Sequence, residues 1–360
     1  MQHKVNIILC GTGTVGGTLL QQIASQQQML KQQHRMDLQV VGIVDIFNIM
    51  TDEKGIGLGG FEMNKFREDF KQCPKSSLSV IHDAVLEMRK AIKDQELAFI
   101  DCTASYEIAN LYQEFIDAGV SIVCANKVAA SGPFDKYRKL KDTAVKNNVK
   151  YLYETNVGAG LPVIQTMQHL VMSGDKITKI EAVLSGTLNY IFNTISDDVT
   201  FSQAVRGAKE ARFAEPDPRI DLSGIDVIRK LVILARESGY QVEQDDVEKH
   251  LFMPDEYFEG TVDDFWQKLP QLDEHFAKVC KEARENNEAL RFVASLEDGK
   301  TKVSLEKFKI GHPFYNLEGS NSIVVLHTER YNPCPMIIQG YGAGAGVTAA
   351  GVFSDIMKLF

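Results

Sequence analysis

The sequence predicts an α/β protein of two domains, and three features carry that prediction. Over the first 150 residues, short apolar runs alternate with stretches of helical spacing, which is typical of a parallel sheet covered on both faces. Near Tyr151 this rhythm changes, and a different unit begins. A glycine-rich segment and an apolar helix close the chain, and a helix this apolar must pack on another surface. We therefore expect a doubly wound N-terminal domain from residues 1–150 and 335–360, and an α+β domain from residues 151–334.

The strands of the N-terminal domain are predicted from apolar runs that end in glycine or polar residues. Residues 5–10 form the first run, which glycines stop before a helix with apolar positions at helical spacing. Three further runs of the same character are residues 38–45, 97–104 and 120–127. The closing segment, residues 340–359, is expected to be a glycine loop and an apolar helix that returns to this domain.

Composition excludes several classes of protein. The formal net charge is −9 over 360 residues and no basic run occurs, which argues against a nucleic-acid partner. The N-terminal apolar run is too short for a signal peptide or a membrane span, so a cytoplasmic protein is expected. The six cysteines lack any Cys-x-x-Cys pair and no two histidines have zinc-ligand spacing, so neither a disulfide framework nor a zinc site is expected.

A glycine motif follows the first predicted strand. Gly11, Gly13 and Gly16 form G-x-G-x-x-G where an apolar strand meets an amphipathic helix. In that context the first glycine permits a tight turn, the second lets the backbone approach a pyrophosphate, and the third permits close packing of helix and strand. The alternative is a plain turn. The predicted dinucleotide site comprises Gly11, Thr12, Gly13, Thr14, Val15 and Gly16.

Asp45 ends the second predicted strand, where an acid commonly accepts hydrogen bonds from an adenosine ribose. It lies farther from the glycines than the usual interval of about 20 residues, and a helix-capping or turn aspartate is the alternative. The residues that follow, Ile46, Phe47 and Asn48, include no arginine for a 2′-phosphate. NAD is therefore favoured over NADP.

Two more segments could bind a ligand. Lys127 ends the fourth predicted strand, at the edge where parallel strands open onto a ligand crevice; a solvated lysine is the alternative. Gly158 and Gly160 form a turn just after Glu154. Such a turn can hold a hard cation through backbone carbonyls, or it can be an ordinary connection from strand to helix.

The segment EPDPRIDLSGIDVIRK, residues 215–230, concentrates four carboxylates. Pro216 and Pro218 predict a stiff extended loop, and a helix over residues 225–238 is predicted to begin from the N-cap Ser223. Asp226 and Lys230 then lie one turn apart on that helix. A surface ion pair is the alternative, but the helix is apolar nearly all round, so we expect it to be buried and its charges to be paired or to line a cleft.

Six segments, in order and over essentially the whole chain, resemble homoserine dehydrogenase. They are GTGTVGG, CANKVA, ETNVGAGLPV, SGTLNYIFN, EPDPRIDLSGIDVIRK and GYGAGAGVTAAGVFSDI. The sequences of the glycine loop, of the helix after it and of the C-terminus are most similar to the dehydrogenase half of the bifunctional aspartokinase–homoserine dehydrogenases. The kinase half and a sensing domain are expected to be missing. The resemblance implies a Rossmann domain, a substrate and dimerisation domain, and a homodimer. It also implies NAD(P)-dependent interconversion of L-homoserine and L-aspartate 4-semialdehyde, in the threonine and methionine branch of amino-acid biosynthesis.

The resemblance also assigns roles to residues. Lys230 is similar to the lysine that donates and accepts the proton, with Asp226 beside it, and Lys127 resembles a second lysine at the nicotinamide and the substrate. Glu215 matches a glutamate that binds the substrate ammonium, and Asp221 matches another acid of that pocket. Residues that resemble monovalent-cation ligands, such as those for Na⁺, are Glu154, Val157, Ala159 and Leu161. Nicotinamide-nucleotide contacts are expected from Thr103 and Gly344.

One departure and two alternatives accompany the resemblance. Several family members have a basic residue shortly after the second strand, where this chain has Asp45, Ile46 and Phe47, so NADP preference is not implied. A related semialdehyde dehydrogenase would need a reactive cysteine, and none of the six lies in an obviously electropositive sequence context. A dinucleotide-sensing protein without catalysis is the non-enzymatic alternative.

Overall fold

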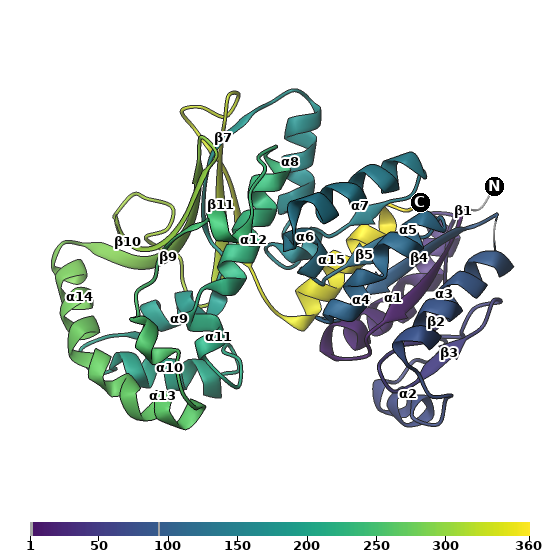
Figure 1. Ribbon diagram of the computed structural model, residues 1–360, viewed down its shortest axis with the longest axis horizontal. Coiled ribbons are helices and arrows are strands. Elements are labelled where there is room, and N and C mark those ends of the chain that lie inside the picture. The colour runs from purple at the N-terminus through teal and green to yellow at the C-terminus, as the bar shows by residue number, and fades with distance from the viewer. Residues whose placement is uncertain (1–2, 93) are drawn as a thin grey trace. The chain divides into compact units, whose positions relative to one another are not determined.

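The computed structural model describes residues 3–92 and 94–360 and divides the chain into two units (Figure 1). The first unit is Met1–Gly160 with Gly344–Phe360, and the second is Leu161–Ala343. Both boundaries lie later than the predicted divisions at 150 and 335. The reason is strand pairing. In the first sheet, β6 (Tyr151–Leu152) pairs with β5 (Ser121–Cys124), and in the second sheet β12 (Met336–Tyr341) pairs with β11 (Asn321–Thr328).

The first unit contains a doubly wound six-stranded sheet in the order β3-β2-β1-β4-β5-β6. All neighbouring strands are parallel except β3, which runs antiparallel to β2. The chain runs from β1 through β2 to β3 and then crosses to β4 on the other side of β1. The carboxyl ends of β1 and β4 therefore lie at a switch point, where such sheets bind ligands. Besides β6, the strands are β1 (His3–Cys10), β2 (Met36–Val44), β3 (Ile49–Thr51), β4 (Glu96–Asp101) and β5 (Ser121–Cys124).

Helices cover the first sheet, and the last of them comes from the end of the chain. α15 (Ala345–Met357) shares a core with α1 (Thr14–Gln33), because its buried Val352 and Ile356 pack with residues such as Leu19. The predicted return of the terminal helix is therefore confirmed. The remaining helices are α2 (Met63–Phe70), α3 (Leu78–Ala91), α4 (Tyr106–Asn110), α5 (Tyr112–Asp117), α6 (Val128–Ser131), α7 (Phe134–Lys146) and the 3-10 turn η1 (Glu154–Asn156).

The second unit contains a six-stranded sheet in the order β12-β11-β7-β9-β10-β8. Its pairs are antiparallel apart from β8 with β10, so the predicted α+β character is confirmed. Besides β12, the strands are β7 (Ile177–Val183), β8 (Glu248–His250), β9 (Glu288–Glu297), β10 (Lys300–Lys309) and β11 (Asn321–Thr328). The α-helices are α8 (Val163–Met172), α9 (Gly186–Thr194), α10 (Phe201–Glu210), α11 (Arg219–Leu222), α12 (Ile225–Glu237), α13 (Val262–Lys268) and α14 (Asp273–Glu285). The 3-10 turns are η2 (Gln244–Asp246), η3 (Asp255–Tyr257) and η4 (Leu269–Leu272).

α12 is buried as predicted, but its start differs from the prediction. Ser223 is not the N-cap: it ends α11, a short helix within the segment predicted to be extended, and its hydroxyl donates to the carbonyl of Ile220. The N-cap is Gly224, whose φ of +69° lets the chain reverse between α11 and α12. A Cβ at Gly224 would also lie 3.1 Å from the ring of Phe292, so space and backbone both favour glycine.

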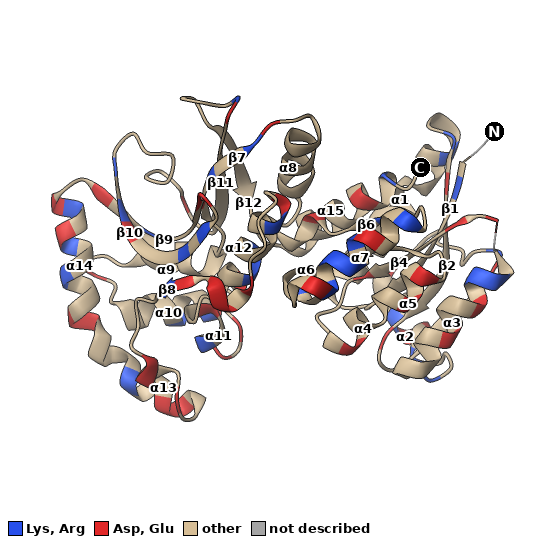
Figure 2. Cartoon of the chain, turned by 45° about the horizontal axis from the view of Figure 1, so that its top comes forward, with Lys and Arg blue, Asp and Glu red and all other residues tan. Residues whose placement is uncertain are grey.

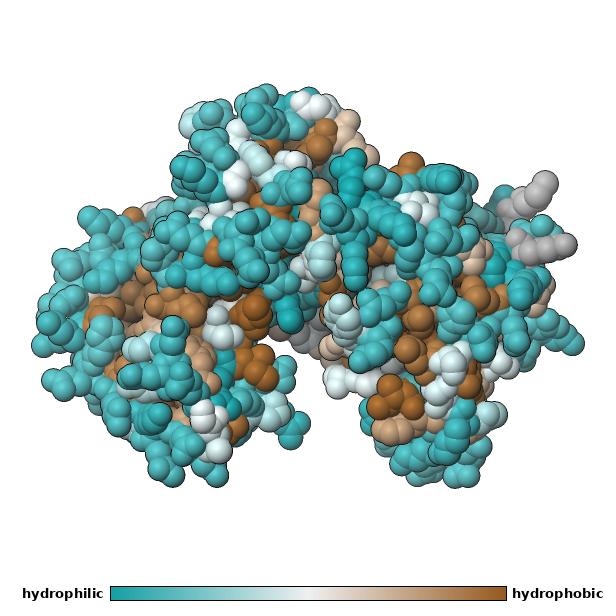
Figure 3. Space-filling model, viewed as in Figure 1, coloured by the Kyte–Doolittle hydropathy of each residue, from teal (hydrophilic) through white to brown (hydrophobic). Residues whose placement is uncertain are grey.

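One face of the molecule is mostly polar (Figure 3). The space-filling view shows hydrophilic residues over most of the visible face, with apolar residues in scattered patches (Figure 3). Among the described residues, no helix is both long and apolar enough to span a membrane.

Candidate active site

The glycine turn of the first unit has the geometry that its motif predicts. Gly11 has a φ of +96°, and its N–H donates to the carbonyl of Val44 at 2.8 Å. A Cβ at Gly16 would overlap the carbonyl oxygen of Gly11, so only glycine lets α1 begin this close to the turn. Gly13 caps α1, and a Cβ built on it would meet no atom within 4 Å. The free backbone N–H groups at the start of α1 can therefore face an anion.

Asp45 has the geometry of a turn aspartate, which was the alternative to a ribose acceptor. One carboxylate oxygen accepts from the backbone N–H groups of Phe47 at 2.8 Å and Asn48 at 2.9 Å, which makes Asp45 the cap of its own turn. The other oxygen accepts from the Thr12 hydroxyl at 2.7 Å. The acid is thus fixed beside the glycine turn. Each carboxylate oxygen has two lone pairs, so the oxygen bound to Thr12 can accept a second hydrogen bond.

Asp101, at the end of β4, organises the loops that carry Thr103 and Lys127. The fully buried carboxylate accepts from the N–H of Thr103 at 2.7 Å, from the Asn126 amide at 3.0 Å and from the Tyr112 hydroxyl. Burial raises the pKa of Asp101 above its usual value, although these donors oppose the rise. The Asp101 network was not predicted, and its only sequence signal is an acid within an apolar strand.

The loop after β5 is anchored on both sides of Lys127. The Asn126 amide donates to the carbonyl of Ser105 at 2.8 Å, which ties this loop to the loop after β4. Lys127 is half-buried, and its carbonyl accepts from the N–H of Ser131 at 2.9 Å and from the Ser131 hydroxyl at 2.8 Å. The carboxyl ends of β1, β2, β4 and β5 therefore bring together the glycine turn, Asp45, Thr103 and Lys127, as predicted for this edge of the sheet.

The turn after β6 is rich in buried oxygen. The N–H of Glu154 donates to Asp355 at 2.9 Å, and the ammonium of Lys358 lies 2.7 Å from Asp355 and 3.5 Å from the Glu154 carboxylate. Burial raises the pKa of Asp355. The hydroxyl of Thr155 and the amide oxygen of Asn156 are buried without a hydrogen-bond partner.

The same turn has the backbone that a cation loop needs. Gly158 and Ala159 both have left-handed φ angles, +78° and +53°, so successive carbonyls of the turn do not follow a regular helix or strand. A hard monovalent cation prefers oxygen ligands, and the unpartnered oxygens nearby fit that preference. Glu154, Val157 and Ala159 belong to the first unit and Leu161 to the second. No cluster of three or more His, Cys, Asp or Glu side chains suited to a metal occurs among the described residues.

The remaining cofactor residue of the prediction, Gly344, caps α15. Its φ is +124°, and it is exposed. Glycine adopts this φ without strain and other residues do not, so the backbone geometry explains why residue 344 is glycine.

Lys230 is one of three buried charged residues of α12, together with Arg236 and Glu237. Its side chain is 10% exposed, and its ammonium lies 2.7 Å from Asp226 and donates to the carbonyl of Leu184 at 2.6 Å. Asp226 is 47% exposed. The predicted pairing on a buried helix is confirmed, and the lysine is held by one charged and one neutral acceptor while the carboxylate reaches solvent.

Glu215, Asp221 and Asp226 form an acidic cluster, which Figure 2 shows around α11 and the start of α12. The N–H of exposed Glu215 donates to Asp221 at 2.9 Å, and the Thr187 hydroxyl lies 2.9 Å from the other Asp221 oxygen. Burial raises the pKa of Asp221, and the negative charges of Glu215 and Asp226 raise it further. Such a cluster stabilises a bound cation. Thr187 was missed as a site residue, although it lies within the segment SGTLNYIFN.

Asp217 belongs to the same loop but has a different task. Arg219 holds its carboxylate with a bidentate contact, and the closest distance is 2.7 Å. The side-chain hydrogen bond from Arg219 is the main cause of the lowered pKa of Asp217. Arg219 also donates to the carbonyl of Gly260 at 2.9 Å, so this pair fastens the loop to the segment before α13.

Cysteine chemistry is disfavoured at the strand ends. Cys10, Cys102 and Cys124 lie at or beside the ends of β1, β4 and β5, and burial together with the charge of Asp101 raises the pKa of each thiol. A reactive thiolate needs the opposite environment. The alternative of a semialdehyde dehydrogenase with a cysteine nucleophile therefore finds no support at this edge of the sheet.

The doubly wound sheet with its glycine turn, together with a buried lysine paired with a half-exposed aspartate and an acidic cluster, defines a dinucleotide-dependent oxidoreductase. Family models agree: residues 11–154 match the NAD binding domain of homoserine dehydrogenase, and residues 162–357 match homoserine dehydrogenase itself. The chain belongs to the homoserine dehydrogenase family.

Individual relatives give the same result. The chain is 40% identical over 354 residues to bifunctional aspartokinase/homoserine dehydrogenase 1 of Arabidopsis thaliana, which covers 98% of this chain and 38% of that protein. It is 36% identical over 355 residues to the bifunctional enzyme of Haemophilus influenzae, with coverage of 98% and 42%. The chain therefore spans about two fifths of the length of these relatives.

Solved structures extend the comparison. A Candida auris protein of unknown function is 33% identical, with a TM-score of 0.87 and coverage of 99% and 98%. A hyperthermophilic archaeal homoserine dehydrogenase in complex with NADPH is 25% identical, with a TM-score of 0.73 and coverage of 99% and 97%.

Proposed function

We propose that the chain interconverts L-homoserine and L-aspartate 4-semialdehyde with a nicotinamide dinucleotide, in the threonine and methionine branch of amino-acid biosynthesis. The observation that carries the proposal is the buried Lys230 ammonium with its two acceptors, Asp226 and the carbonyl of Leu184. The bound nicotinamide ring supplies the hydride chemistry, and the protein orients the reactants and handles the proton.

In this proposal the acidic cluster binds the substrate ammonium. Glu215 is exposed and Asp221 is half-buried, so Glu215 offers a hydrated carboxylate while Asp221 fixes the loop by accepting its N–H. Asp217 is already paired with Arg219 and is left out of this role. Glu215 is thus the main ammonium ligand, and Asp221 shapes the pocket around it.

Lys230 moves the hydroxyl proton. In the oxidative direction its neutral amine accepts that proton, and in the reductive direction its ammonium returns it to the developing alkoxide. Asp226 and the Leu184 carbonyl hold the side-chain nitrogen of Lys230 in place, at 2.7 and 2.6 Å. Lys127, whose backbone is anchored through Ser131, is the second lysine of the mechanism and contacts the cofactor and the substrate.

The cofactor groups are the glycine turn, Asp45, Thr103, Lys127 and Gly344. The N–H groups at the start of α1 would take the pyrophosphate, and Asp45 would accept from the adenosine ribose. A 2′-phosphate near Asp45 would meet a like charge. We therefore propose that NAD serves at least as well as NADP, although the archaeal relative is in complex with NADPH.

A monovalent cation such as Na⁺ is proposed for the turn after β6, held by backbone carbonyls of Glu154, Val157, Ala159 and Leu161. The support is the left-handed geometry of the turn and its unpartnered oxygens. Lys358, 3.5 Å from the Glu154 carboxylate, already supplies positive charge to that side chain, so main-chain oxygens are the better ligands.

Further proposals concern the location and the assembly of the protein. We propose a cytoplasmic homodimer whose second unit, Leu161–Ala343, carries both the substrate groups and the subunit contact. Sedimentation equilibrium of the purified chain measures the subunit number directly, and a monomer at assay concentration would contradict the dimer.

The experiment that tests the main proposal is an assay of purified chain with L-homoserine and either NAD or NADP. We expect a steady rise in the absorbance of reduced nicotinamide that depends on both substrates. No rise with either cofactor, while the cofactor still binds, would instead support the dinucleotide-sensing alternative.

A further inference from the structure

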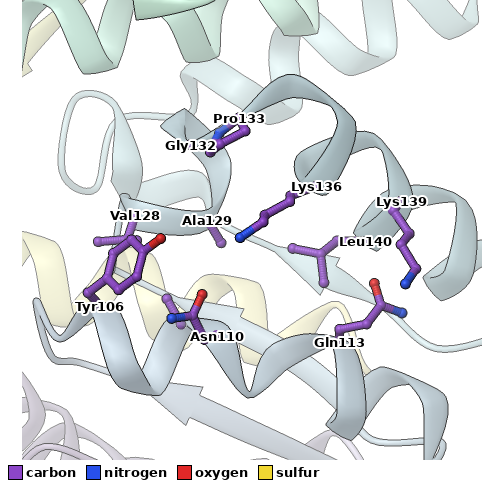
Figure 4. Close-up of a pocket in the computed structure, with 11 residues that line it drawn as sticks. Tyr106, Asn110, Gln113, Val128, Ala129, Gly132, Pro133, Lys136, Lys139 and Leu140 are labelled. Carbon is purple, nitrogen blue, oxygen red and sulfur yellow. The ribbon is translucent and has the colours of Figure 1, made fainter.

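A cavity of about 230 Å³ lies in the first unit between two pairs of helices (Figure 4). Residues of α4 and α5 line one wall, and residues of α6 and α7 line the other. Its floor is apolar, with buried Ala109 and Leu140 beside Val128. The lining contains none of the residues assigned above to cofactor, substrate or cation.

Two lysines from α7 stand at this cavity, and its lining includes no acidic residue. Figure 4 shows Lys136 extending into the space toward Asn110, and Lys139 extending toward Gln113. Neither ammonium forms an ion pair with any carboxylate of the described chain. In a protein of net charge −9, the cavity is therefore a locally positive site.

The arrangement of these charges favours an anion. Lys136 and Lys139 are three residues apart on one helix, so the two like charges lie on neighbouring positions of the same face and repel each other. A carboxylate between them would remove that repulsion. The Asn110 amide on the facing wall can donate a further hydrogen bond to such a group.

The floor and the size restrict the rest of the ligand. Apolar surface at Ala109, Leu140 and Val128 gives no hydrogen bonds to an inorganic ion but favours a hydrocarbon body. With about 30 Å³ per water molecule, the cavity holds roughly eight waters, the space of a ligand with about ten non-hydrogen atoms. We propose that this cavity is a second ligand site, which binds a small organic carboxylate through Lys136 and Lys139 and packs its apolar body on the floor.

Isothermal titration calorimetry of the intact chain with phenylacetate tests the proposal. Acetate supplies the charge without the body, and 2-phenylacetamide supplies the body without the charge. For a ligand of this size we expect a dissociation constant on the order of millimolar for phenylacetate and binding at least about tenfold weaker for each control. Equal binding of acetate, or no saturable binding of phenylacetate, would overturn the proposal.

Variants place the binding at this cavity. Lys136→Gln/Lys139→Gln should weaken phenylacetate binding about tenfold or more, whereas Lys146→Gln, on the same helix but outside the cavity lining, should leave it unchanged. Ala129→Leu, which adds bulk to a half-buried lining position of α6, should also abolish binding without removing a charge. Circular dichroism verifies that each variant is folded. Wild-type affinity in the double lysine variant or in Ala129→Leu would refute the assignment.

Discussion

Replacing Lys230 by Met should separate catalysis from stability on α12. Methionine keeps the unbranched apolar stem and removes the ammonium that lies 2.7 Å from Asp226 and 2.6 Å from the Leu184 carbonyl. The carboxylate left behind is 47% exposed, so water can solvate it, and one neutral carbonyl loses a donor. We expect the free energy of unfolding to change by only about 1 kcal/mol, while the turnover of homoserine falls by about 10²–10⁴ through the loss of general acid–base catalysis.

Asp226→Asn is the matched partner variant. It breaks the same contact from the other side and leaves the Lys230 ammonium, which is 10% exposed, with only the Leu184 carbonyl and the neutral amide. A buried charge without a partner lowers the free energy of unfolding more than an exposed one does. Because Asp226 is half-exposed, however, solvent already screens part of its interaction with Lys230. We expect a loss of about 1–2 kcal/mol in unfolding free energy and a smaller loss of turnover than in Lys230→Met.

The assays are urea denaturation for stability and the absorbance of reduced nicotinamide for turnover, with cofactor binding measured separately. If Lys230 is catalytic, Lys230→Met loses more turnover than Asp226→Asn. Asp226→Asn in turn loses more unfolding free energy than Lys230→Met. Near-normal turnover of folded Lys230→Met would refute the reasoning. The pair would then be a structural ion pair of a buried helix, and Lys127 would become the leading proton carrier.

Four other predictions follow from the site. Glu215→Gln should raise the KM for homoserine more than it lowers kcat, because the substrate ammonium is bound in ground and transition states alike; a fall in kcat with unchanged KM would contradict this role. Asp45→Ala should increase kcat/KM for NADP relative to NAD, since it removes a charge held by Thr12 beside the glycine turn; an unchanged ratio would show that another residue sets cofactor preference. Asp101→Asn should weaken NADH binding and lower unfolding free energy by about 1–3 kcal/mol, because an amide cannot accept from Thr103, Tyr112 and Asn126 together; wild-type NADH affinity would exclude a positioning role. The pKa of Asp221 is raised by folding, so protonation of this group favours the folded state: its contribution is complete below the unfolded value of about 4 and is lost as pH rises through the folded pKa. Asp221→Asn should remove that part of the pH dependence of unfolding, and an unaltered profile would show that Asp221 does not titrate as inferred.

The sequence predicted the features that depend on neighbouring residues. The glycine turn, the burial of α12 and the Asp226–Lys230 pair each follow from a few residues within one or two turns of chain. The N-cap was wrong because Ser223 is used by the preceding helix, which prolines were expected to prevent, and only the left-handed Gly224 reveals the reversal.

The features that the sequence did not predict depend on pairing between distant segments. Asp101 and Asn126 are 25 residues apart, and they meet because β4 and β5 lie side by side. Thr187 and Asp221 come from different helices and are joined by a hydrogen bond that no local sequence pattern predicts. The residues proposed as ligands could thus be named from motifs, whereas the groups that position them required the fold.

The return of α15 to the first unit has a consequence for biosynthesis. On a ribosome, β1 and α1 emerge before the second unit, but the helix that supplies Val352 and Ile356 to their shared core is made only after the whole of Leu161–Ala343. Until then the nascent first sheet exposes the apolar surface that α15 will cover, so the first unit cannot be completed before the second unit has been made. Deleting α15 should therefore speed the hydrogen exchange of the β1 amides, even though β1 and α15 are far apart in the sequence.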